Sequence, residues 1–121
     1  LKLFGGSGGY GNGEQRRDFI YVEDIVKIIL WFFQEKTKSG IFNAGTGKSS
    51  SFNDLATAII NWHAQHGLKG AIEYIPFPSH LNSCYQHFTE ADLTKLRGIG
   101  YPHQFTSITE GVGKYLEAIN N

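Results

Sequence analysis

The stretch from residue 17 to residue 44 is the part of the sequence that most constrains the fold. Residues 17–22 are rich in aromatic and β-branched side chains and predict a strand. Residues 24–38 carry apolar side chains at helical spacing, which predicts a helix with Asp24 as its N-cap. Residues 41–44 predict a second strand. A strand-helix-strand unit implies two parallel strands, and a parallel sheet needs cover on both faces, so we expect an α/β piece of something larger.

Shorter elements flank this unit. Residues 2–4 predict a strand that pairs with residues 17–22 as a long-looped hairpin. Residues 72–77 predict another strand, which Pro76 and Pro78 place at the edge of a sheet. The remaining helices are predicted to open at three pairs of capping residues: Ser51 with Asp54, Thr89 with Asp92, and Ser107 with Glu110. The first of these helices is predicted to end near Gly67.

The composition excludes several classes of protein. The chain has 121 residues, of which 40% are hydrophobic, enough for one core and too many for a disordered segment. Eleven basic residues balance eleven acidic ones, so no net field gathers nucleic acid or an anionic membrane. No stretch reaches the roughly 18 apolar residues of a membrane helix. Cys84 is the single cysteine and forms no internal disulfide, which favours a cytoplasmic location.

The sequence contains no methionine. Because translation starts with methionine, we expect Leu1 not to be the native start, and the chain to be a fragment of a longer protein.

Six glycines fall within residues 5–13. The spacing of Gly5, Gly8 and Gly11 imitates a dinucleotide-binding fingerprint, but that fingerprint delivers a pyrophosphate to a helix that follows at once. Here a polar segment and a predicted strand follow instead. We therefore expect a loop between strands, which could still wrap a ligand through its backbone amides.

The segment GTGKS at residues 45–49 imitates the end of a nucleotide-triphosphate loop. That motif needs a glycine where this chain has Phe42, so we interpret the segment as a structural turn. His63 and His66 lack an acidic or cysteine partner at metal-ligand spacing, which favours solvated histidines. Cys84 has no evident base beside it and is more consistent with a structural thiol than with a nucleophile.

Acidic neighbours at Asp18, Glu23 and Asp24 do not support paired carboxylate catalysis. Asp24 is assigned to a helix cap, and Asp18 follows two arginines. Those arginines, Arg16 and Arg17, stand beside the glycine-rich loop. A guanidinium next to backbone amides can clamp a diphosphate, since arginine offers a planar fork and stays charged. An ordinary pair of surface arginines is equally compatible with the spacing.

Two segments resemble a known superfamily: RDFIYVxDI at residues 17–25 and GIFNxGTG at residues 40–47. They are similar to the second half of extended short-chain dehydrogenases/reductases, the nucleotide-sugar epimerases and dehydratases. A narrower resemblance, to the ADP-L-glycero-D-manno-heptose 6-epimerase family, is carried by KLFxGS at residues 2–7, IEYIPFP at 72–78, YQxFTxADL at 85–93, and EGV at 110–112.

The resemblance implies a C-terminal, substrate-binding portion, residues 1–121, of a Rossmann-type enzyme. It implies inversion of the sixth carbon of an ADP-bound heptose, a precursor of the lipopolysaccharide core, through transient oxidation by NADP. It also implies a cytoplasmic homo-oligomer when the enzyme is intact. The substrate contacts implied for this chain are Phe4, Gly5, Gly6, Ser7, Arg17 and Tyr85.

The family's cofactor fingerprint and its Tyr-x-x-x-Lys pair have no counterpart in this sequence. No catalytic or NADP-binding residue is therefore expected in the chain, and we expect the chain alone to be inactive. Two alternatives remain: another nucleotide-sugar epimerase or dehydratase, and a stand-alone nucleotide-sugar-binding domain.

Overall fold

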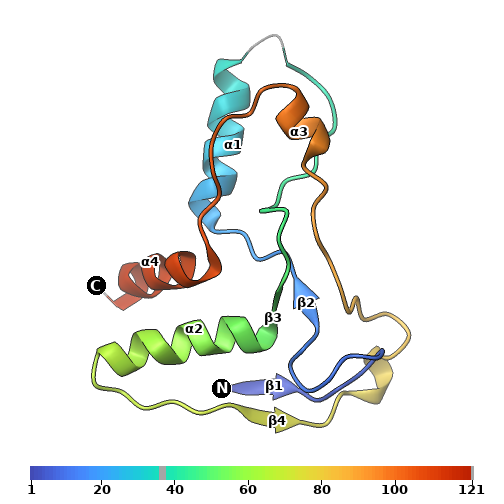
Figure 1. The fold of residues 1–121 in the computed structure, drawn as a ribbon, viewed down its shortest axis with the longest axis vertical. Coiled ribbons are helices and arrows are strands. Elements are labelled where there is room, and N and C mark those ends of the chain that lie inside the picture. The colour runs from blue at the N-terminus through green and yellow to red at the C-terminus, as the bar shows by residue number, and fades with distance from the viewer. Residues whose placement is uncertain (36–37, 121) are drawn as a thin grey trace.

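Two groups of elements occupy the two ends of an elongated molecule (Figure 1). The computed structural model describes residues 1–35 and 38–120. One end holds helices α1 (Val22–Gln34) and α3 (Thr94–Gly98). The other end holds strands β1 (Lys2–Phe4) and β4 (Glu73–Ile75), with helix α2 (Phe52–Gln65) above them. Helix α4 (Ile108–Asn120) packs on α2.

Two small sheets join segments that are distant in sequence. Strand β1 pairs in parallel with β4, with Leu3 opposite Tyr74. Strand β2 (Arg16–Arg17) pairs antiparallel with β3 (Ser50–Ser51). The predicted α/β class is confirmed, and the strand predicted at residues 72–77 is confirmed as β4.

The predicted strand pairings are wrong. Residues 2–4 pair with β4 and not with residues 17–22, of which only Arg17 is in a strand. Residues 41–44 form no strand, so the expected parallel crossover is absent from the described residues. Ile41 is 88% exposed, and no strand of the described residues pairs with this segment. Aromatic and β-branched composition identified extended chain here, but a strand also needs a partner for its backbone hydrogen bonds.

The predicted N-cap of α1 is also wrong. Tyr21 occupies the N-cap position without a side-chain hydrogen bond, and Asp24 lies in the first turn. The Asp24 carboxylate is buried and accepts hydrogen bonds from the Thr106 amide at 2.6 Å and from Lys27 Nζ at 2.9 Å. It thereby ties α1 to the segment before α4. Helix α1 ends at Gln34, and residues 36–37 of the predicted helix lie outside the described residues.

Two of the three predicted capping pairs are confirmed, and the third is wrong. Ser51 and Asp54 form the predicted capping box of α2, with both reciprocal hydrogen bonds present. Helix α2 ends at Gln65, as expected from Gly67. Ser107 Oγ accepts from the Glu110 amide at the start of α4, as predicted. The helix predicted to open at Thr89 instead begins at Thr94, whose amide donates to Asp92 Oδ1 at 2.8 Å.

A hydrophobic core cluster lies at the α1 end of the molecule, and Ala56, Ala58 and Leu116 are buried where α2 packs on α4. Ile28, Leu96 and Tyr101 are buried together, and partly buried aromatic side chains from α1 and from residue 42 pack around them. None of the helices in the part of the chain that the structure describes is long and apolar enough to cross a membrane.

Candidate functional site

Phe4 and Tyr85, two of the six predicted site residues, line a small cavity, and a third, Arg17, lies against the Tyr85 ring. The Phe4 and Tyr85 ring centroids are 6.3 Å apart, and the Arg17 guanidinium carbon lies 5.1 Å from the Tyr85 centroid. The cavity has a volume of about 140 Å³ and is lined by Lys2, Leu3, Phe4, Gln15, Phe52 and Tyr85. Segments from the start, the middle and the last third of the chain thus build one site.

The Arg17 side chain is held mainly by aromatic rings. Its guanidinium carbon is 6.0 Å from the Phe52 ring as well as close to Tyr85, and Nη1 donates to the Arg16 carbonyl at 2.9 Å. Among the described residues, no carboxylate lies within ion-pair distance of it. Arginine has five N–H donors, so most of this fork is available to an anion, and stacking on the rings fixes its orientation.

Arg16 has a different environment. Its Nη2 donates to the Ser49 carbonyl at 2.6 Å and its Nε to the Ser49 hydroxyl at 3.2 Å. These contacts join β2 to the segment before α2. Of the two arginines that the sequence offered as a diphosphate clamp, the structure therefore leaves Arg17 available and uses Arg16 to hold the fold.

The glycine-rich loop reaches the same site but uses two of its amides internally. The Gly5 amide donates to the Ile75 carbonyl at 2.7 Å, and the Gly6 amide donates to Asn12 Oδ1 at 2.9 Å. A Cβ atom at Gly6 would lie 2.6 Å from the Tyr10 carbonyl oxygen. Gly5 and Gly6 thus allow close approach of the backbone, and their amides do not point to an open anion site.

Ser7 and two residues that the sequence analysis missed complete the site. His87 Nε2 lies 3.1 Å from Ser7 Oγ, and the buried Gln15 side chain donates to the Gly5 carbonyl at 2.9 Å. Gln15 stands in a polar stretch that gives no signal. His87 is two residues after Tyr85, and in an extended segment such residues share a face, which is the one signal that could have identified it.

Asp18 organises the turn at residues 45–47. Its carboxylate accepts from the amides of Thr46, Gly47 and Ala91 at 2.8, 2.9 and 3.0 Å, and from the Thr46 hydroxyl. Burial alone raises the pKa of Asp18, but these hydrogen bonds outweigh it and hold that pKa below its usual value. The GTGKS segment is therefore a structural turn, as predicted, and Asp18 is part of the scaffold.

The other candidate chemistries find no support in the geometry. The glycine run leads into β2 and not into a helix, so this run does not fit the dinucleotide-binding fingerprint. His66 Nδ1 contacts the Trp62 carbonyl, and no group of three metal-ligating side chains occurs in residues 1–35 and 38–120. Cys84 is exposed.

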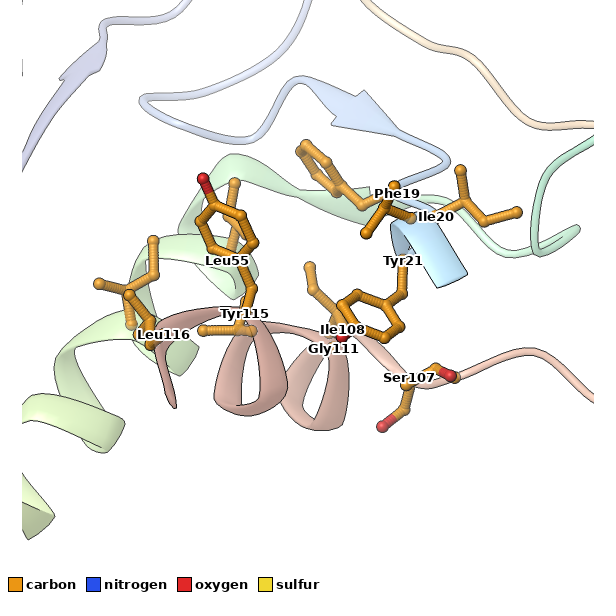
Figure 2. A pocket seen from close by; sticks show the side chains of 13 residues that line it. Phe19, Ile20, Tyr21, Leu55, Ser107, Ile108, Gly111, Tyr115 and Leu116 are labelled. Atoms are coloured by element: carbon orange, nitrogen blue, oxygen red, sulfur yellow. The ribbon is translucent and has the colours of Figure 1, made fainter. Parts of the chain in front are cut away.

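A larger pocket is apolar. It has a volume of about 410 Å³ and lies between residues 19–22, α2 and α4. Figure 2 shows the aromatic side chains of Phe19, Tyr21 and Tyr115 together with Leu55 and Leu116 around it. Such a lining suits apolar contact and offers no cation for a phosphate.

Helix α1 carries a second unpartnered apolar surface. Val22, Val26, Ile29 and Phe33 follow each other at helical spacing, and all four side chains are exposed, Phe33 to 80%. A flanking face of α1 packs into the core through Ile25, Ile28 and Phe32. A helix that is apolar on both faces is typical of one that is buried on both sides.

Comparison with known proteins agrees with this architecture. Residues 6–45 match the profile of the NAD dependent epimerase/dehydratase family. The ADP-L-glycero-D-manno-heptose-6-epimerase of Helicobacter pylori superposes with a TM-score of 0.69 at 26% identity, over 99% of this chain and 32% of that enzyme. An NAD-dependent NDP-hexosamine 5,6-dehydratase of tunicamycin biosynthesis has a TM-score of 0.63 at 29% identity, over 98% and 35% of the two chains.

A third solved structure shares the fold at lower identity. The UDP-N-acetylglucosamine 4-epimerase of Methanobrevibacter ruminantium has a TM-score of 0.68 at 23% identity, over 97% of this chain and 34% of that one. This chain spans about a third of the length of each of these enzymes. The chain therefore has the α/β fold of one part of the Rossmann-type nucleotide-sugar epimerases and dehydratases, which are NAD(P)-dependent enzymes.

Proposed function

We propose that this chain is the nucleotide-sugar-binding portion of an NAD(P)-dependent epimerase or dehydratase. The observation that carries the proposal is the Arg17 guanidinium, stacked against Tyr85 and Phe52 beside the glycine-rich loop, with no carboxylate partner in the described part of the chain. The enzymes that share the fold are named for ADP-, UDP- and NDP-sugars, which have the diphosphate in common.

In this proposal Arg17 donates a pair of charge-assisted hydrogen bonds to the diphosphate. The Ser7 hydroxyl, which lies 3.1 Å from His87 Nε2 and 3.4 Å from Asn82 Oδ1, and the Tyr85 hydroxyl are the further groups that we propose to contact phosphate or sugar oxygens. A cavity of about 140 Å³ is smaller than the roughly 300–1,000 Å³ of a site that encloses a whole small-molecule ligand. The chain would thus grip the diphosphate region, while the nucleoside and the reacting sugar extend beyond it.

The narrower proposal is an ADP-L-glycero-D-manno-heptose 6-epimerase. Its support is the set of family-like segments at residues 2–7, 72–78 and 85–93, together with the similarity to the Helicobacter pylori enzyme. Under this narrower proposal, the intact enzyme uses NADP as its cofactor, takes part in lipopolysaccharide core synthesis, is cytoplasmic and forms a homo-oligomer. The chain alone would be inactive, because no tyrosine in it has a lysine four residues later.

The nicotinamide cofactor supplies hydride transfer in such enzymes. The glycine run of this chain does not enter a helix as a dinucleotide-binding turn does, so we place the cofactor site in a separate dinucleotide-binding portion of the enzyme. Such a portion would cover two apolar surfaces. One is the pocket between α2 and α4, and the other is the outer face of α1, which carries Val22, Val26, Ile29 and Phe33.

Calorimetric titration of ADP into the chain tests the proposed function. We expect Arg17→Ala to weaken binding by about 10- to 100-fold, since a hydrogen bond to a charged group contributes about 1.5–3 kcal/mol. The matched control is Lys69→Ala, which removes one positive charge from an exposed loop outside the site. Equal loss in both variants would show a non-specific charge effect, and no loss in Arg17→Ala would refute the clamp.

A further inference from the structure

His87 lies where the glycine-rich loop meets the rest of the site. Its imidazole plane is within 5° of parallel to the Tyr10 ring, and its Nε2 contacts Ser7 Oγ at 3.1 Å. The Phe77 and Tyr85 rings lie on its other sides, with centroids at 6.1 and 5.3 Å. One side chain therefore contacts the loop and the aromatic residues around Arg17.

The tip of the loop packs directly on this ring. Ser7 and Tyr10 form an antiparallel bridge, with the Tyr10 amide donating to the Ser7 carbonyl at 3.1 Å, so Gly8 and Gly9 make a tight turn. A Cβ atom at Gly8 would lie 2.5 Å from His87 Nε2, whereas one at Gly9 would meet nothing within 4 Å. The imidazole thus fills the space under Gly8.

The backbone of His87 is fixed to the strand that carries Arg17. The Arg16 amide donates to the His87 carbonyl at 2.8 Å, and the Thr89 amide donates to the Arg16 carbonyl at 3.2 Å. These bonds set the position of the His87 side chain relative to Arg17. Ser7 of the loop, 80 residues away from His87 in sequence, contacts this imidazole and also donates from its hydroxyl to Asn82 Oδ1 at 3.4 Å.

We propose that His87 is a positioning residue, which holds Ser7 and the turn at residues 7–10 over the site and thereby strengthens its grip on a nucleoside diphosphate. The inference rests on the proposed function for its ligand, but the ordering of the loop is a property of the chain without ligand. His87 contacts Ser7 and the loop backbone, and it strengthens diphosphate binding through these contacts.

Two substitutions separate the hydrogen bond from the ring. His87→Phe keeps an aromatic ring on Tyr10 and Phe77 but loses the contact with Ser7 Oγ. His87→Gln loses the ring but keeps a polar group that reaches Ser7. With ADP as the probe in calorimetric titrations of the full chain, we expect His87→Phe to weaken binding by about 5-fold, the equivalent of one neutral hydrogen bond. His87→Gln should recover affinity to within about 2-fold of the unsubstituted chain.

Coupling to Ser7 provides the readout that a purely structural role would not move. Ser7→Ala should weaken ADP binding at least as much as His87→Phe does, and the double variant should be no weaker than Ser7→Ala alone, because the effect of His87 passes through Ser7. In the chain without ligand, backbone NMR should show increased mobility of Gly8 and Gly9 in His87→Phe.

Two results would overturn the inference: unchanged affinity in His87→Phe with an unchanged loop, or additive effects of Ser7→Ala and His87→Phe. Failure of the proposed function is recognised separately, since the unsubstituted chain would then bind no ADP. In that case the backbone mobility of Gly8 and Gly9 tests the positioning role by itself, and the role is rejected if His87→Phe leaves that mobility unchanged.

Discussion

The glycine-rich loop and the outer face of α1 differ in how far their side chains and backbone groups find partners within the chain. The loop has its polar groups paired within the chain: the Gly6 amide with Asn12, the Gly5 carbonyl with Gln15, and Ser7 with His87. The α1 face leaves large apolar side chains in solvent, with Ile29 exposed to 61% and Phe33 to 80%. The loop end is thus complete in itself, whereas the α1 end presents a surface that suits further protein.

The two ends of the molecule also differ in the kind of binding that their side chains suit. The loop end carries a cation, hydroxyls and aromatic rings within one small site, which indicates ligand binding. The α1 end carries only apolar surface, which indicates contact with protein. The proposed division of the enzyme, with a substrate grip here and a dinucleotide site elsewhere, follows from that contrast.

Acid should have the largest effect on the scaffold that both ends share. The pKa values of Asp18 and Asp24 are lowered; burial raises each, and hydrogen bonds, chiefly from Thr46 and from Lys27 respectively, outweigh it. Groups with lowered pKa stabilise the folded chain at neutral pH, and that contribution is lost as the pH falls below about 4 and through the folded-state values.

Asp18→Asn should therefore lower the free energy of unfolding at pH 7 by about 1–3 kcal/mol. It should also flatten the acid dependence measured by urea denaturation between about pH 5 and pH 2. An unchanged slope would show that the carboxylate has no such role.

Substitutions in the turn test whether the loop is fixed by contact or by backbone conformation alone. Gly8 and Gly9 both have positive φ, at 62° and 84°, so alanine at either position costs about 1–2 kcal/mol of strain. Only Gly8 faces His87. Gly8→Ala should be the more destabilising in thermal unfolding, with Gly9→Ala as its matched control, and equal losses would contradict the packing described here.

The outer face of α1 should tolerate charge with little loss of stability. Phe33→Glu is expected to change the free energy of unfolding by no more than about 0.5 kcal/mol, because the side chain is exposed. It should reduce self-association of the isolated chain in sedimentation velocity, since it interrupts an apolar surface. Ile28→Glu, on the buried face of the same helix, is the contrasting variant and should unfold the α1 end.

Several local signals in the sequence predicted local structure correctly, although the Asp24 N-cap and the helix start at Thr89 were wrong. The Ser51–Asp54 capping box, the start of α4 and strand β4 each follow from a few neighbouring residues. The prediction of strand pairing was wrong because pairing depends on partners far away in sequence: the aromatic stretch after Arg17 has no strand partner among the described residues, and β1 pairs with residues about 70 positions later.

The same distinction applies to the candidate site. Family-like segments predicted Phe4, Arg17 and Tyr85, and the structure brings them together. Gln15 was missed because its role exists only through its contact with the loop, and for His87 the one local signal is its spacing of two residues from Tyr85. The amides of Gly5 and Gly6 were expected to face a ligand, but backbone and side-chain oxygens in the chain already accept from them.

The most direct test of the central claim compares ADP with AMP in the chain with and without Arg17. If Arg17 grips the diphosphate, the unsubstituted chain binds ADP about 10-fold or more tightly than AMP, and Arg17→Ala abolishes that preference while leaving the affinity for AMP nearly unchanged. A preference for ADP that survives in Arg17→Ala would contradict the account.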